Sequence, residues 1–191
     1  NKRKNLFALN VAKKTKMDML VLTEGYMDTI TMHQYGFDCA VASLGTSLTD
    51  QQAAMLKKYT NQMVLCYDGD QAGQNAAKRA IGILEKTGIA VKVLRMQGAK
   101  DPDEFLRKYG AERFRKLLSD SEDQAVYQLE TIRRKHDVSS DEGKVEYLQE
   151  AAAFIATLSS AVEREVYCTR VAETAGVQAD AVKLEANQIG R

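Results

Sequence analysis

Met63-Val64-Leu65-Cys66-Tyr67-Asp68-Gly69-Asp70 is an apolar run that ends in two acids around a glycine. The run is continuously apolar, as in parallel strands that are buried on both faces. Gly69 gives the backbone freedom to turn, so that both carboxylates can face one point. The stretch therefore predicts a buried parallel strand over Met63–Tyr67 with acids at its carboxyl end.

Two further apolar runs, Met19–Thr23 and Ala90–Arg95, are also followed by acids. Parallel strands of an α/β sheet present their carboxyl ends to one crevice, so acids that follow several strands converge there. The acids of the three clusters are Glu24, Asp28, Asp68, Asp70, Asp101 and Asp103.

Six like charges cannot share one crevice at low energy unless a cation joins them. Carboxylates are hard oxygen ligands, which Mg²⁺ prefers together with water and substrate phosphates. The histidines, His33 and His136, are expected in or near helices and are interpreted as non-catalytic. The acids therefore predict magnesium and phosphate chemistry, with no zinc site.

Several of these acids also have a purely structural interpretation. Asp70 can cap a helix that begins at Gln71, and Asp28 can lie in a first helical turn. Asp101 can cap a helix with Pro102 at its first position, where proline is favoured. Glu24 and Asp68 follow apolar strands, where a charge has no evident structural role.

Strands and helices alternate from residue 18 to about residue 97, which predicts βαβ units. The fold class is α/β: a mainly parallel four-stranded sheet between helices, followed by a small all-α bundle. The expected strands are Met19–Thr23, Cys39–Ser43, Met63–Tyr67 and Ala90–Arg95, and the expected helices between them are Met27–Tyr35, 49–59 and Gln71–Lys86. No strand is expected over 111–191, where the predicted helices are 111–119, 122–136, 141–158, 161–175 and 179–188.

The predicted domains are a basic lead-in over 1–17, an α/β domain over 18–110 and a helical part over 111–191. The lead-in has six basic residues and no acid, and 111–191 has a net charge of −4 within an overall +1. A basic arm beside an acidic cleft suits a nucleic-acid backbone or nucleotide phosphates, although it could also be a solvated arm. The sequence starts abruptly at Asn1, without Met and in the middle of a pattern, which predicts that it is a fragment of a longer protein.

The composition argues against a membrane-spanning or a secreted protein. The chain has 191 residues, 45% of them hydrophobic and 28% charged, as in globular proteins. No apolar stretch approaches the roughly 20 residues that cross a bilayer, and no signal peptide is visible. The three cysteines, Cys39, Cys66 and Cys168, lie far apart, which argues against a disulfide framework, and a cytoplasmic protein is predicted. Cys39 and Cys66 are in or beside apolar strands and are expected to be buried.

The motifs together resemble the TOPRIM domain of bacterial DnaG-type primases. The resemblance rests on Val21–Asp28, Ala40–Ser47, Tyr67–Gly73 and Asp101–Glu104, which follow in the family's order and spacing. Asn1–Phe7 resembles the segment that precedes TOPRIM in those enzymes. The helical remainder is compatible with the family's helical subdomain.

The resemblance implies Mg²⁺-dependent synthesis of RNA primers on single-stranded DNA from ribonucleoside triphosphates, in DNA replication. It implies that Glu24, Asp68, Asp70 and Asp101 hold Mg²⁺ or Mn²⁺, with two ions, and that Glu24 either binds metal or transfers protons. By the same resemblance, Asp28 and Asp103 are further ligands or neighbours of ligands, and Lys2, Ser43 and Gly45 contact nucleotide or nucleic acid.

Complete primases of this type also have a zinc module, another half of the polymerase core and a C-terminal region that binds the replicative helicase. None of these is recognised in this sequence. The isolated chain is therefore expected to bind metal but to be a weak or inactive primase, with helicase contact through a region outside it.

Three alternatives remain open on the sequence. Asp68-x-Asp70 also resembles the start of haloacid-dehalogenase-type phosphatases, but Ala72 occupies a position where that family has Thr or Val. Another TOPRIM protein, a nuclease or topoisomerase-like enzyme, shares the acids. Val171–Val177 and the helix after it resemble a helix-turn-helix, for which a non-catalytic protein-docking role is favoured because Asp180 and Glu185 make the second helix acidic.

Overall fold

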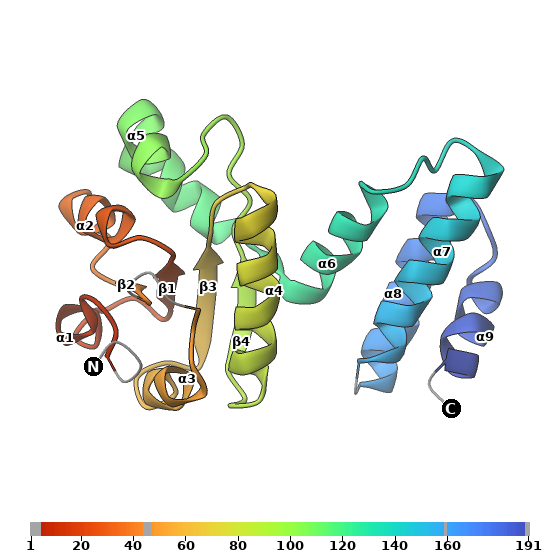
Figure 1. Ribbon diagram of the computed structural model, residues 1–191, viewed down its shortest axis with the longest axis horizontal. Helices are drawn as coiled ribbons and strands as arrows, with labels where there is room; N and C mark the ends of the chain where they lie inside the picture. The colour runs from red at the N-terminus through yellow and green to blue at the C-terminus, as the bar shows by residue number, and fades with distance from the viewer. Residues whose placement is uncertain (1–4, 44–46, 159, 190–191) are drawn as a thin grey trace. The chain divides into compact units, whose positions relative to one another are not determined.

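The computed structural model of the chain describes residues 5–43, 47–158 and 160–189. The chain forms two compact units, residues 1–124 and 125–191 (Figure 1). Unit 1 contains α1 (Leu9–Ala12), β1 (Leu20–Thr23), α2 (Tyr26–Gln34), β2 (Ala40–Ala42), α3 (Asp50–Leu56), β3 (Gln62–Cys66), α4 (Gln71–Glu85), β4 (Ala90–Val93), α5 (Pro102–Ser119) and β5 (Glu122–Asp123). Unit 2 contains α6 (Gln124–Arg133, whose first residue belongs to unit 1), α7 (Asp141–Ala156), α8 (Ala161–Ala175) and α9 (Ala179–Ile189).

The sheet has the strand order β2-β1-β3-β4-β5, and its first four strands are parallel. The expected four-stranded parallel sheet is therefore confirmed. β1 pairs with both β2 and β3, with Val21 opposite Ala40 on one side and Val64 on the other. Every residue of β1 and β2 is buried, which explains why these strands are continuously apolar.

The chain direction reverses at β1. It passes from β1 to β2 in one direction along the sheet and from β2 to β3 to β4 in the other. Right-handed crossovers therefore place α2 on one face of the sheet and α3 and α4 on the other. The reversal creates a switch point between β1 and β3, where ligands bind in open α/β sheets of this order.

The helix starts follow the capping signals of the sequence. Thr49 caps α3 in a capping box with Gln52, as predicted. The side chains of Asp70 and Asp101 cap α4 and α5, so the structural interpretation of both acids holds. Gly110, with φ of 80°, interrupts α5 and separates its first turns from the predicted helix over 111–119.

Two predictions about the polar segments were wrong. Glu122–Asp123 forms the short strand β5, antiparallel to β4, where only helices were expected. α6 consequently begins at Gln124 instead of residue 122. The lead-in also has structure of its own, because it contains α1 and an antiparallel bridge between Phe7 and Ala42.

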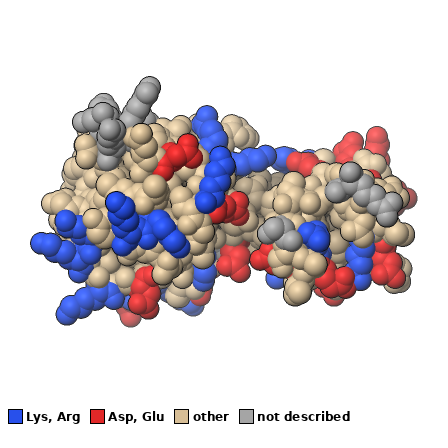
Figure 2. All heavy atoms as spheres, turned by 90° about the horizontal axis from the view of Figure 1, so that it is seen from below, with Lys and Arg blue, Asp and Glu red and all other residues tan. Residues whose placement is uncertain are grey.

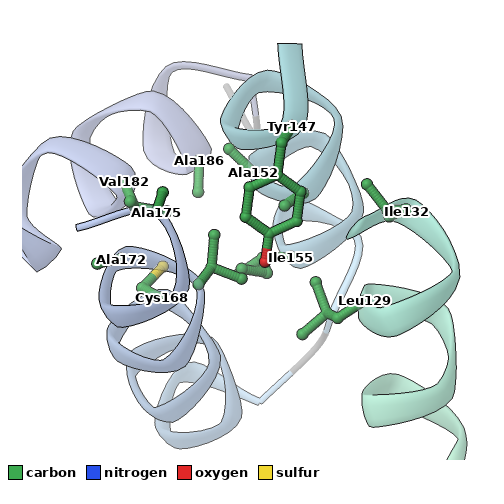
Figure 3. Packing of buried hydrophobic residues seen from close by; sticks show 12 residues of the cluster. Leu129, Ile132, Tyr147, Ala152, Ile155, Cys168, Ala172, Ala175, Val182 and Ala186 are labelled. Carbon is green, nitrogen blue, oxygen red and sulfur yellow. The ribbon is translucent and has the colours of Figure 1, made fainter. Parts of the chain in front are cut away.

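Unit 2 is a helical bundle with its own core (Figure 3). Its buried residues come from all four helices: Leu129, Ile132, Tyr147, Ala151, Ala152, Ile155, Cys168, Val171, Ala172, Ala175, Val182 and Ala186. The many alanines in this core allow helices to approach closely, and Gly176, with φ of 72°, ends α8. Cys168 is one of three free cysteines, all of them buried, which confirms the burial expected for Cys39 and Cys66.

No helix in the described part of the chain is long and apolar enough to cross a membrane.

Candidate functional site

Glu24 and Asp68 follow the two strands of the switch point. The backbone N–H of Asp68 donates to Oε1 of Glu24 over 3.1 Å, which ties the end of β3 to the end of β1. Gly73, in the first turn of α4, lies against this link: a Cβ there would be 2.2 Å from the carbonyl oxygen of Asp68. A glycine is thus required for α4 to approach the acids.

Asp70 and Asp101 complete the end of the sheet while capping their helices. Oδ1 of Asp70 accepts from the N–H of Gly73 over 2.7 Å, and Oδ1 of Asp101 accepts from the N–H of Glu104 over 2.7 Å. In each carboxylate only Oδ1 accepts the capping hydrogen bond. The same side chain can therefore cap its helix and take part in the site through Oδ2.

The carboxylates lie close enough to change one another's protonation. Burial, and then repulsion from Asp68 and Asp70, raise the pKa of Glu24. Burial, followed by repulsion from Asp101 and Asp70, also raises the pKa of Asp68. The effect is larger for Asp28, where burial and then the charges of Asp101 and Asp68 raise the pKa to about 6. Five of the six predicted acids therefore form one electrostatic group.

Asp103 behaves differently from the other five. Thr31 Oγ1 donates to Oδ1 of Asp103, and Nε of Arg107 lies 3.0 Å from both carboxylate oxygens. The hydrogen bond from Thr31 and then the pairing with Arg107 hold the pKa of Asp103 below its ordinary value. Its backbone N–H also donates to Asp28 over 3.3 Å. Asp103 therefore joins α5 to α2 and supports Asp28.

The remaining predicted residues are located only in part. Ser43 directly follows β2 and is 4% exposed. Lys2 and Gly45 lie outside the described residues. Among the residues that are described, no three His, Cys, Asp or Glu side chains are placed to hold one metal ion as they stand. The five acids thus form an electrostatic group and not a closed coordination cage.

Sequence reasoning missed the threonines that support the site. Thr23 and Thr29 are fully buried, and their hydroxyl oxygens lie 2.8 Å apart between the end of β1 and α2. Thr23 also donates to the carbonyl of Gly25 over 3.0 Å, next to Glu24. No pattern in the sequence indicates these contacts, since a threonine is ordinary both in a buried strand and in a helix.

An apolar groove opens elsewhere on unit 1, between α1 and α2. Its lining includes Leu6, Val11, Ile30 and His33 and none of the six acids. One ring nitrogen of His33 lies 2.9 Å from the carbonyl oxygen of Ala40, consistent with a structural role.

Asp28→Asn is expected to raise the free energy of unfolding of the metal-free chain by about 1 kcal/mol at pH 7, after solvent screening is allowed for. The folded-state pKa of Asp28 is above its unfolded value, so ionisation destabilises the fold as pH rises from about 4 to about 6. Asparagine keeps the acceptor for Asp103 and removes the charge. The gain should vanish at pH 4 in urea titrations, with exposed Asp18→Asn as control; an equal gain at pH 4 and pH 7 would contradict it.

Comparison with known proteins agrees with this geometry. The Toprim-like family matches residues 21–106, and the family described as the DnaB-helicase binding domain of primase matches residues 126–180. The second match corrects the expectation that the helicase-binding region lies outside this chain. The matched segment includes most of unit 2.

The DNA primase of Clostridium acetobutylicum is 37% identical to this chain over 179 residues, which are 93% of the chain and 30% of that relative. The chain thus spans about a third of the length of this curated relative.

Two solved structures show the same fold. A DNA primase domain from Pseudomonas aeruginosa superposes with a TM-score of 0.75 at 28% identity, over 98% of this chain and 60% of that one. A DnaG primase catalytic domain bound to single-stranded DNA gives a TM-score of 0.71 at 28% identity, over 91% of this chain and 57% of that one. With its acids at the β1/β3 switch point and its two family segments in this order, the chain belongs to the bacterial DnaG-type primases and contains their TOPRIM domain.

Proposed function

We propose that this chain is the acidic half of a primase catalytic core, which joins ribonucleotides into RNA primers on a single-stranded DNA template. The observation that supports this most strongly is the convergence of five carboxylates at the β1/β3 switch point, where the charges of Asp68, Asp70 and Asp101 raise the pKa of neighbouring acids. Structural relatives of this chain include a primase catalytic domain bound to single-stranded DNA.

The donor set fits a hard divalent cation. The acids are oxygen donors, burial and mutual repulsion raise the pKa of three of them, and Lys100, 4.0 Å from Asp101, is the cation paired there in the described part of the chain. Mg²⁺ uses few carboxylates and keeps water and phosphate ligands, so an open group of acids suits it. The residues that would hold Mg²⁺ or Mn²⁺, as two ions, are Glu24, Asp68, Asp70 and Asp101.

Bound divalent ions would neutralise phosphate charge during nucleotidyl transfer. The chain's own residues then act around them. Glu24 either contributes a ligand or holds a proton, and its link to Asp68 keeps the ends of β1 and β3 in register. Asp28 is a further ligand or a neighbour of one. Asp103, held by Thr31 and Arg107, positions the start of α5.

Nucleic acid and nucleotide are the proposed partners of unit 1. Over residues 1–124 there are 19 Lys and Arg against 15 Asp and Glu, and Figure 2 shows basic side chains gathered on one face of this unit. A polyanionic template or primer is attracted to such a surface. Lys2, Ser43 and Gly45 are proposed contacts, by family resemblance alone.

The replicative helicase is the proposed partner of unit 2. The support is the match of residues 126–180 to the helicase-binding domain of primases. Unit 2 has its own core, so it can present a docking surface formed by its own helices.

The experiment that tests the function is primer synthesis on a single-stranded DNA oligonucleotide with labelled ribonucleotides. The complete primase that includes this sequence is expected to make Mg²⁺-dependent primers, and the isolated chain few or none. Robust synthesis by the isolated chain would refute the idea that it is one half of the site. Inactivity of the complete protein would refute the proposed function.

A further inference from the structure

An exposed aromatic ring lies within the acid cluster's own sequence. Tyr26 is 55% exposed and its neighbour Met27 is 51% exposed, although both stand between Glu24 and Asp28. Single exposed apolar residues are common on protein surfaces. Two in succession between proposed ligand residues call for a more specific explanation.

The ring of Tyr26 is held in place by Phe7. The two rings meet edge to face, with centroids 6.1 Å apart and an angle of 62° between their planes. Phe7 is itself fixed, because its backbone N–H donates to Ala42 over 2.8 Å and its carbonyl accepts from Ala42 over 3.3 Å. A ring held in this way loses little conformational entropy when a flat ligand covers its free surface.

The other exposed tyrosines of the described chain are placed differently. Tyr35 ends α2 and Tyr59 follows α3, so both lie far along their elements from the carboxyl ends of β1 and β3. Tyr26 begins α2 directly after β1 and its acid. Of these three exposed tyrosines, Tyr26 alone adjoins candidate-site residues along the chain, between Glu24 and Asp28.

The surrounding charges define which ligand suits this ring. Glu24 and Asp28 repel acidic peptides, whereas a nucleotide brings a flat uncharged base together with phosphates that a divalent ion can join to the acids. Every nucleobase has a face that stacks on an aromatic side chain. We propose that Tyr26, supported by Phe7, is a stacking platform for a nucleobase, supplied either by a nucleoside triphosphate or by single-stranded DNA.

This inference rests on the proposed function. It adds a residue that binds the base, whereas the acids are proposed to hold the metal ions. It is tested by binding of ATP and of a dT12 oligonucleotide to the chain in Mn²⁺. The matched base-free probes are inorganic tripolyphosphate and an abasic 12-mer. The variants are Tyr26→Ala, Tyr26→Phe and, as a control, the comparably exposed Tyr59→Ala.

Tyr26→Ala is expected to weaken binding of ATP, of dT12 or of both by about 5- to 150-fold, the usual value of one base–aromatic stack. Tyr26→Phe and Tyr59→Ala should bind as the unchanged chain does, and the base-free probes should not discriminate among the variants. A loss with ATP alone identifies the nucleotide as the source of the base, and a loss with dT12 alone identifies the DNA.

A spectroscopic measurement keeps the test independent of affinity. The chain has no tryptophan, so Tyr26→Trp places a single reporter at the platform. Its fluorescence should be quenched by ATP or dT12 and not by the base-free probes, whereas Tyr59→Trp should not respond.

The proposal is overturned if Tyr26→Ala binds both base-containing ligands normally, if it loses base-free ligands equally, or if the unchanged chain binds neither ATP nor dT12. Thermal stabilisation by Mn²⁺ should persist in Tyr26→Ala. That readout separates failure of the platform from failure of the metal site, which the acids alone determine.

Discussion

Asp68→Asn combined with Asp70→Asn is expected to abolish stabilisation of the chain by Mn²⁺ and to reduce primer synthesis by the complete primase at least about 10³-fold. Electrostatic stabilisation of the reacting groups is commonly the largest contribution to catalysis, and the loss of one such group costs about 10²–10³-fold. Two adjacent proposed ligands are removed here. Asparagine remains a good N-cap, so α4 keeps the bond from Gly73 that Asp70 now accepts.

Two quantities are measured: primer synthesis by the complete primase, and the thermal stability of the isolated chain with and without Mn²⁺. In the unchanged chain, Mn²⁺ at one hundred times its Kd should add about 2.7 kcal/mol to the free energy of unfolding, which raises Tm by several degrees. The double variant should show no rise, while exposed Asp18→Asn responds normally. A normal metal response in the double variant would exclude Asp68 and Asp70 as ligands.

Gly73→Ala is expected to destabilise unit 1 by about 3 kcal/mol, although alanine normally favours a helix. The new Cβ would lie 2.2 Å from the carbonyl oxygen of Asp68 and 2.9 Å from Oε1 of Glu24. The nearer atom belongs to the backbone, so α4 or the end of β3 must move. Either movement breaks the link between Asp68 and Glu24 and should weaken the response to Mn²⁺.

Two other glycines provide matched controls in urea unfolding. Gly82 lies in the same helix, is exposed, and has open space where its Cβ would be, so Gly82→Ala should stabilise the chain by up to about 1 kcal/mol. Gly143 lies in the first turn of α7, and a Cβ there would be 2.1 Å from the carbonyl oxygen of Asp137, so Gly143→Ala should destabilise unit 2 without altering the metal response. A stable, metal-responsive Gly73→Ala variant would contradict the close approach of α4.

The elements that are apolar or capped could be predicted from the sequence. The strand that precedes Asp68 is predicted over Met63–Tyr67 and is found at Gln62–Cys66. The prediction works because a short, continuously apolar run is typical of a parallel strand that is buried on both faces. The capping box at Thr49 and the cap at Asp101 set the starts of α3 and α5. Local hydrogen bonds of this kind depend on neighbours three residues away, which the sequence shows directly.

The contacts that depend on distant backbone could not be predicted. Glu122–Asp123 has no apolar pattern and forms a strand only because its backbone pairs with that of β4. Within the candidate site, the pairing of Asp103 with Arg107 is visible at a spacing of four residues, whereas the bond from Thr31 joins residues 72 positions apart. The sequence therefore indicated that the acids converge, but not that Asp103 is held apart from the rest.

The short strand β5 and the bridge at Phe7 have one further consequence. They cover the two outermost strands of the parallel sheet, β4 and β2, whose backbone groups would otherwise be open to pairing. Open strands of this kind join neighbouring molecules into aggregates. A shorter protein restricted to the Toprim-like match at 21–106 would lose both covers, and its buried apolar strands could pair between copies. Segments outside the six candidate-site acids thus protect the sheet edges of the acidic domain from pairing between copies.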